Sequence, residues 1–113
     1  MLNKDYYILL SMLETTEKIF RYTRNYISAE ELFENDRDFD AVMMNFIVMG
    51  EESGKLTDAL KNHNQQVNWR KIYGFRNIIA LHYFGINVDL VWQIIRNDLP
   101  KLKKQLQSII DDM

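Results

Sequence analysis

The sequence contains no cysteine, and this absence removes several kinds of chemistry at once. Without cysteine the chain can form no disulfide, use no thiolate nucleophile and hold no zinc ion through cysteine ligands. The lack of disulfides suits a reducing compartment, and we expect the protein to work in the cytoplasm.

Glycine and proline are also scarce, with four and one among 113 residues. Because tight turns use these residues, their scarcity argues against a many-stranded sheet and favours long helices. No segment approaches the roughly 20 apolar residues of a membrane span. Ser11 and Glu14 interrupt the N-terminal segment early, so we expect no signal peptide. These features predict one all-α domain over residues 1–113.

The net charge of −2 hides an uneven distribution of charge along the chain. Residues 30–40 carry six acidic side chains and one basic residue, Arg37. Between Asp58 and Asp89 there is no acid, and this window holds Lys61, Arg70, Lys71, Arg76, His63 and His82. Such a window can attract an anion such as phosphate, although a solvated helix face has the same pattern.

The apolar spacing at the start of the chain predicts two helices. Residues 4–25 form the first, because apolar side chains and one threonine recur every three or four residues, at Leu2, Tyr6, Leu9, Leu13, Thr16 and Phe20. Ser28 followed by Glu31 is a capping-box pattern, which predicts a short second helix.

Three further helices are expected from the same signals. The third runs roughly from Phe39 to His63, with Asp36 or Asp38 as its cap. The fourth follows the polar loop at 62–68, begins at Trp69 after the cap Asn68, and ends near Gly85. The fifth runs from Val88, capped by Asn87, to about Asp111, with Pro100 kinking or splitting it. The pattern predicts a four- to five-helix up-and-down bundle.

The fourth helix has two apolar faces. Arg76 lies at the centre of the first, where Glu51 or Glu52 could neutralise it, among Trp69, Ile72, Tyr73, Ile79, Ala80 and Tyr83. The second face comprises Lys71, Phe75, Ile78 and His82. A helix with two apolar faces must be covered twice, either inside the monomer or by a second copy of the chain.

Several motifs together resemble one known family. They are RNIIALHYFGINVDLVWQIIRNDLP at 76–100, DAVMMNFIVMGEESGKL at 40–56, RYT at 21–23 and the tryptophan at 69. In combination they closely resemble the HepT-like ribonuclease toxins, a branch of the HEPN superfamily formerly described as nucleotidyltransferase substrate-binding-like proteins. The resemblance extends over about nine-tenths of the chain.

The resemblance implies a dimeric HEPN-like bundle that acts as a metal-independent endoribonuclease, the toxin of a type II toxin–antitoxin pair. By position, Arg76 and His82 are its catalytic residues in a cleft between two copies, supported by Asn77 and Glu51. An imidazole can move the proton of the RNA 2′-hydroxyl, and a guanidinium can hold the phosphate. We expect no metal and no cofactor, because the sequence offers no metal-ligand spacing.

The sequence departs from the family pattern at the histidine. Relatives usually read RN-x-x-x-H-x-Y-F-G, whereas this chain reads RNIIALHYFG, with Leu81 at the usual histidine position and His82 one residue later. On a regular helix this shift turns the imidazole by about 100°. Tyr83 matches the tyrosine to which, the resemblance implies, a partner nucleotidyltransferase can attach AMP.

Three hypotheses about function remain open. The first is an RNA-cleaving toxin neutralised by a nucleotidyltransferase antitoxin, working as a homodimer or a higher even oligomer. The second is a non-catalytic helical partner, or substrate-binding subunit, of a minimal nucleotidyltransferase, which the displaced His82 favours. The third is a helical interaction module. None of the three predicts binding to DNA or to a membrane.

Overall fold

The computed structural model describes residues 3–113, so the apolar position expected at Leu2 lies outside the described residues. The chain forms α1 (Lys4–Thr23), α2 (Ala29–Glu34), α3 (Asp36–Lys55), α4 (Asp58–His63), α5 (Trp69–His82), a 3-10 turn (Tyr83–Gly85), α6 (Val88–Gln93), a π turn (Ile94–Asp98) and α7 (Leu99–Asp111). No strand occurs within residues 3–113, which confirms the all-α prediction.

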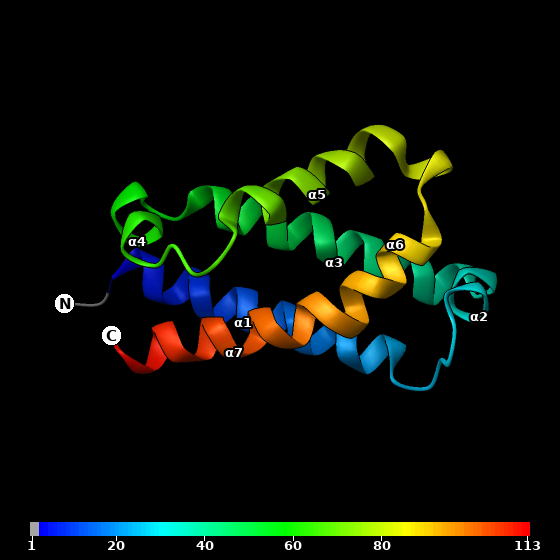
Figure 1. Cartoon of the computed structure of the whole chain (residues 1–113), viewed down its shortest axis with the longest axis horizontal. Helices are drawn as coiled ribbons and strands as arrows, with labels where there is room; N and C mark the ends of the chain where they lie inside the picture. Colours follow the sequence, from blue (N-terminus) through cyan, green and yellow to red (C-terminus); the bar gives the residue numbers. More distant parts are fainter. Residues whose placement is uncertain (1–2) are drawn as a thin grey trace.

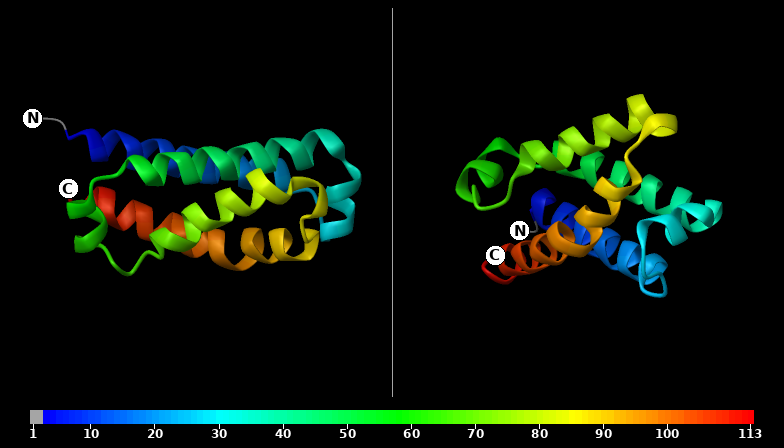
Figure 2. Two further views of the ribbon diagram at one scale, coloured as in Figure 1. Left: turned by 90° about the horizontal axis from the view of Figure 1, so that it is seen from above. Right: turned by 45° about the vertical axis from the view of Figure 1, so that its right-hand side comes forward.

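The long helices form an up-and-down bundle (Figure 1). The helix α3 packs against both α1 and α5, and α7 packs against α1. The first helix begins and the last helix ends at the same end of the molecule, while α2 covers the opposite end (Figures 1 and 2). No helix in the described part of the chain combines the length and apolar character that crossing a bilayer requires.

The core of the bundle draws apolar side chains from every long helix. Its deeply buried members include Leu9, Met12 and Ile19 of α1, Leu32 of α2, Val42 and Met43 of α3, Ile79 of α5, and Val91, Leu99 and Leu106 of the last helical run. Asparagine and serine side chains set several helix starts, because their oxygens accept from backbone N–H groups of the first turn. Ser28, Asn68 and Asn87 act in this way, as the sequence predicted.

The third helix differs from the prediction at both ends. Asn35 is its N-cap and accepts from the Asp38 N–H at 3.1 Å, so neither Asp36 nor Asp38 is the cap. The helix ends at Lys55, and Thr57 caps the separate helix α4 by accepting from the Leu60 N–H at 3.2 Å.

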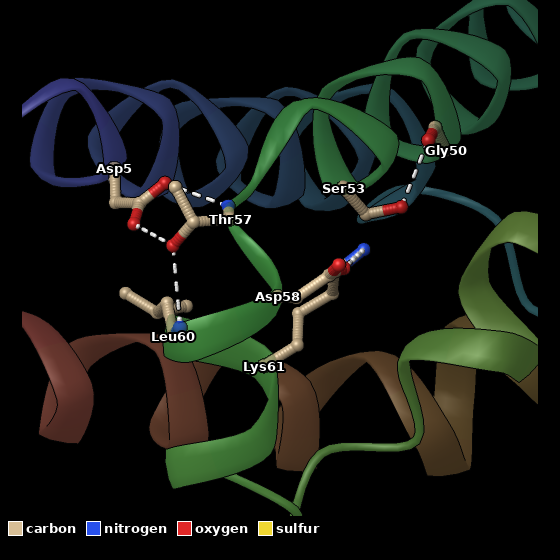
Figure 3. A network of polar contacts seen from close by, with 7 residues as sticks. All are labelled: Asp5, Gly50, Ser53, Thr57, Asp58, Leu60 and Lys61. Atoms are coloured by element: carbon tan, nitrogen blue, oxygen red, sulfur yellow. Dashed lines mark hydrogen bonds and ion pairs between the residues drawn. The ribbon is translucent and has the colours of Figure 1, made fainter.

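A buried carboxylate explains why the chain breaks at Thr57 (Figure 3). Asp5 of α1 is 2% exposed, and its two oxygens accept from the Thr57 N–H at 3.0 Å and the Thr57 hydroxyl at 2.5 Å. Burying a carboxylate requires such partners, because an unpaired one is strongly destabilising. The contact joins residues 52 positions apart and therefore could not be seen in local sequence patterns.

The last two predicted helices are also modified at specific points. The helix α5 ends at His82, and Gly85 closes a 3-10 turn without adopting a positive φ, so it is not the left-handed cap we expected. The final helix is interrupted where Pro100 was expected to disturb it. In the π turn at Ile94–Asp98 the Leu99 N–H donates to the Ile94 carbonyl, one residue further back than in an α-helix.

Candidate active site on helix α5

Arg76 lies on the side of α5 that faces the end of α3, and three hydrogen bonds fix its guanidinium. Its Nε donates to Glu51 Oε1 at 2.9 Å, Nη2 donates to the same oxygen, and Nη1 donates to Asn77 Oδ1 at 2.7 Å. The Arg76 Cζ also lies 5.6 Å from the ring centroid of Tyr73. The structure therefore brings together Arg76, Asn77 and Glu51, as the sequence predicted.

The partner of Arg76 is Glu51 alone of the two glutamates considered. One carboxylate oxygen of Glu52 is instead buried without a hydrogen-bond partner among residues 3–113. The Arg76 side chain is 27% exposed and that of Glu51 46%, so the pair lies at the surface of the bundle. Three of the five N–H groups of the guanidinium are engaged, which leaves donors for an incoming anion.

Gly50 allows α5 to approach α3 closely beside Arg76. A Cβ atom at Gly50 would lie 2.3 Å from Arg76 Cβ and 2.7 Å from Arg76 Cγ, distances at which atoms overlap. Only a glycine leaves room for the stem of Arg76 on the surface of α3. The glycine in the GEE segment thus sets where the guanidinium lies.

The buried side chains of α5 form a line along the helix, and this buried line lies between the two faces that the sequence suggested. Phe75 and Ile79 are buried and Ile72 packs partly against the core, while Tyr73, Ala80 and His82 are exposed. Arg76 and His82 therefore lie on different edges of α5, to either side of this buried line. Within residues 3–113 the His82 ring makes no hydrogen bond or ion pair, so a single chain does not join it to Arg76.

Tyr83 is paired with an acid that the sequence analysis did not single out. Its hydroxyl donates to Asp40 Oδ1 at the start of α3. The hydrogen bond to Asp40, followed by burial and by the charges of Asp40 and Asp36, raises the pKa of Tyr83 to about 12. The sequence shows only that Asp40 ends the acidic stretch. The antiparallel course of α3 and α5 in the structure places it near the end of α5.

Apolar side chains remain exposed around the end of α5. Leu81 is 76% exposed and Phe84 is 101% exposed, and Ile78 and Met44 are also substantially exposed. Single exposed apolar residues are ordinary, but several near one helix end form a surface of the kind that proteins cover on association.

These features define an all-helical bundle with a surface arginine held by a glutamate and an asparagine. Over residues 12–109 the chain matches the family described as ribonuclease HepT-like. The chain belongs to this family.

Individual relatives agree with this assignment. The chain is 30% identical to "Putative RNase MJ1380" of Methanocaldococcus jannaschii, over 89% of this chain and 92% of that protein. It is 27% identical to "Probable ribonuclease HepT" of Thermococcus cleftensis, over 95% of this chain and 94% of that protein. No solved structure matches the chain.

Proposed function

We propose that this protein is a metal-independent endoribonuclease whose active centre combines Arg76 of one chain with His82 of a second copy. The observation that carries the proposal is the fixed position of Arg76 at the surface, with guanidinium donors left for a phosphate. The family match and the names of the relatives support RNA as the substrate.

The proposed reaction uses the nucleophile that RNA itself carries. The 2′-hydroxyl oxygen attacks the adjacent phosphorus, and the neutral His82 imidazole takes the hydroxyl proton. The bond from phosphorus to the 5′-oxygen breaks, and this oxygen receives a proton from the imidazolium. The products are a 2′,3′-cyclic phosphate and a free 5′-hydroxyl. Arg76 binds the phosphate oxygens as charge develops on them, while Asn77 and Glu51 orient the guanidinium.

A dimer would bring Arg76 of one copy close to His82 of the other. Because Arg76 and His82 lie on different edges of α5, their positions favour a site that takes one residue from each of two copies. Two antiparallel copies of α5 would set the exposed end of each helix, with His82, against the middle of the other, with Arg76. The exposed Leu81 and Phe84 would be covered in the same contact.

Regulation by a nucleotidyltransferase antitoxin would act through Tyr83. In this proposal the Tyr83 oxygen attacks the α-phosphorus of ATP on the antitoxin, pyrophosphate leaves, and Asp40 receives the phenolic proton. The resulting AMP group would stand beside the active centre and block RNA. The protein would then be the toxin of a cytoplasmic toxin–antitoxin pair, which is consistent with a chain that has no cysteine.

The alternative function is a non-catalytic helical partner of a nucleotidyltransferase. The displaced histidine favours it, since His82 is exposed and lies away from Arg76. In that case Tyr83 and Asp40 would bind the enzyme while the fold carried no nuclease chemistry.

The deciding experiment measures cleavage of labelled RNA in excess EDTA by the purified chain and by Arg76→Ala and His82→Ala. We expect each variant to lose at least about 100-fold in rate. Arg24→Ala, which removes an exposed arginine at the end of α1, is the matched control and should cleave normally. An inactive wild-type chain that forms folded dimers would leave the non-catalytic function in its place.

Mixing the two inactive variants tests the shared active centre. A heterodimer of Arg76→Ala and His82→Ala contains one site with both residues intact, so random exchange of subunits should restore about a quarter of the wild-type rate. If both residues served the same chain, no activity would return on mixing.

A further inference from the structure

A second feature of α5 is a pocket on the edge away from Arg76. It has a volume of about 270 Å³ and opens between the first half of α5 and the start of α7, with α3 at its base. Its apolar base includes Met49, Ile72 and Ile94, and the ring of Phe75 stands edge-on to that of Phe46 with centroids 5.0 Å apart. A cavity of about 150 Å³ accepts a benzene ring, so this pocket has room for a larger flat ring system.

The rim of this pocket is polar and carries groups of several kinds. Lys71 of α5 contacts Asp98 across the opening at 3.5 Å, and the Gln105 side chain of α7 donates to the Gln66 carbonyl at 2.9 Å. Both contacts are between exposed groups and are therefore easily exchanged for a ligand. Lys101, also on the rim, has no ion pair within residues 3–113.

We propose that this pocket is a base-binding subsite for single-stranded RNA, an inference that rests on the proposed nuclease function. The base would enter the apolar base of the pocket, and its edge would meet the amides of Gln66 and Gln105 and the carboxylate of Asp98. The phosphate attached to that nucleotide would bind Lys71 and Lys101. Single-stranded RNA is commonly held in this way, with bases against apolar and aromatic side chains and the backbone along cations.

The composition of the rim favours RNA over an amphiphilic anion such as a fatty acid. A hydrocarbon chain with one acidic end would use the lysines but leave two amides and a carboxylate without a role at the opening. A nucleobase edge offers both donors and acceptors to such groups. The two cations lining the pocket against a single acid also match the charge of an RNA backbone.

The position of the pocket agrees with the shared active centre. Lys71 lies on the same edge of α5 as His82, which follows it by eleven residues, or about 16 Å along the helix axis. A strand that enters the pocket could thus pass His82 of the same chain and meet Arg76 of the partner subunit.

Binding can be measured without cleavage by using an RNA hexamer methylated at every 2′-oxygen, since this probe lacks the nucleophile. With isotope-labelled isoleucine and methionine methyl groups, we expect the hexamer to shift the NMR signals of Met49, Ile72 and Ile94. The signals of Met12 and Ile19, buried in α1 away from the pocket, should not move.

Charge reversal on α7 supplies the matched pair of variants. Lys101→Glu should weaken hexamer binding by about tenfold or more, because it places a negative charge beside the phosphate. Lys104→Glu changes the same helix by the same charge on a side chain that does not line the pocket, and should weaken binding by less than about threefold. Both positions are exposed, so both variants should fold.

Each other outcome overturns the subsite. Hexamer binding that leaves the pocket methyl signals unmoved, or that responds equally to both reversals, removes the subsite while cleavage of ordinary RNA by the wild-type chain would still support the nuclease. Shifts of the pocket signals by decanoate but not by the hexamer would assign the pocket to an amphiphilic anion. If the wild-type chain neither bound the hexamer nor cleaved ordinary RNA, the subsite and the proposed function would both be wrong.

Discussion

The two sides of α3 are packed in different ways. On one side α1 and α7 close around the core, and the polar groups there are used to hold helices together, as Asp5 holds Thr57. On the other side α5 packs mainly on α3, and polar groups of α5 and of the turn after it reach the surface, as Arg76 and Tyr83 do.

This difference separates side chains that stabilise the fold from those available for chemistry. A carboxylate that is 2% exposed and hydrogen-bonded to its neighbours can bind nothing else, whereas a partly exposed guanidinium with remaining donors can bind an anion. Substitutions on the two sides should therefore have different consequences.

The largest effect on stability is expected at the contact between α3 and α5. Gly50→Ala would place a Cβ atom 2.3 Å from Arg76 Cβ and force the helices apart. We expect a loss of about 2–3 kcal/mol in the free energy of unfolding, measured by urea denaturation. Gly74→Ala is the matched control, because nothing lies within 4 Å of its Cβ, and it should stabilise α5 by about 0.5–1 kcal/mol. Equal changes in stability for Gly50→Ala and Gly74→Ala would contradict the close approach of α5 to α3 at Gly50.

The buried carboxylate should give the next largest effect. Asp5→Ala removes the acceptor for the Thr57 N–H and for the Thr57 hydroxyl hydrogen, so both donors lose the hydrogen bond they make in the structure. We expect a loss of about 2 kcal/mol, visible in thermal unfolding. Asp58→Ala, an exposed acid in the first turn of α4 whose one ion pair within residues 3–113 spans 4.0 Å, should change stability by less than about 0.5 kcal/mol. If Asp5→Ala left the stability unchanged, this contact would not be what holds α4 in place.

The Tyr83–Asp40 pair should appear as a pH dependence at alkaline pH. The folded state raises the pKa of Tyr83 from 10.0 to about 12, so folding favours the protonated phenol. Its contribution to stability is complete below pH 10 and is lost as the pH rises through 12. Urea unfolding at pH 9 and pH 12 should show this loss in the wild-type chain and a smaller one in Tyr83→Phe.

Replacing the acceptor sharpens this test. Asp40→Asn should lower the pKa of Tyr83 back toward 10, measured from phenolate absorbance with Tyr83→Phe subtracted. Tyr26, whose hydroxyl donates to Asp38, carries a raised pKa of its own and should be unaffected. If Asp40→Asn left the pKa of Tyr83 unchanged, the hydrogen bond would be absent in solution.

The smallest effect on the stability of the single chain is expected at the exposed apolar side chains. Leu81→Ser and Phe84→Ser should change its free energy of unfolding by less than about 0.5 kcal/mol, because both side chains are highly exposed. In sedimentation experiments the same variants should dissociate the proposed dimer. Ile27→Ser removes an equally exposed residue, 84% accessible, between α1 and α2 and should leave the dimer intact. Dissociation by all three variants would argue against a specific contact at α5.

Much of the candidate site could be predicted before the structure. The motif placed Asn77 beside Arg76, and the need of a guanidinium on an apolar face for a partner pointed to Glu51 or Glu52. Asn77 and Glu51 are its hydrogen-bond partners. The role of Asp40 could not be predicted in this way, because it depends on the side-by-side course of α3 and α5. Whether His82 and Tyr83 act as proposed remains a prediction.

The sequence by itself determined the helical class, most of the helix starts and the family. Helix periodicity, capping residues and motifs are local, so they can be read from neighbouring residues. Only the tertiary structure decided that α3 ends at Lys55, that Gly50 sets the position of Arg76, and that the buried line of α5 separates Arg76 from His82. These outcomes depend on contacts between residues far apart in the chain, whose energies no local pattern contains.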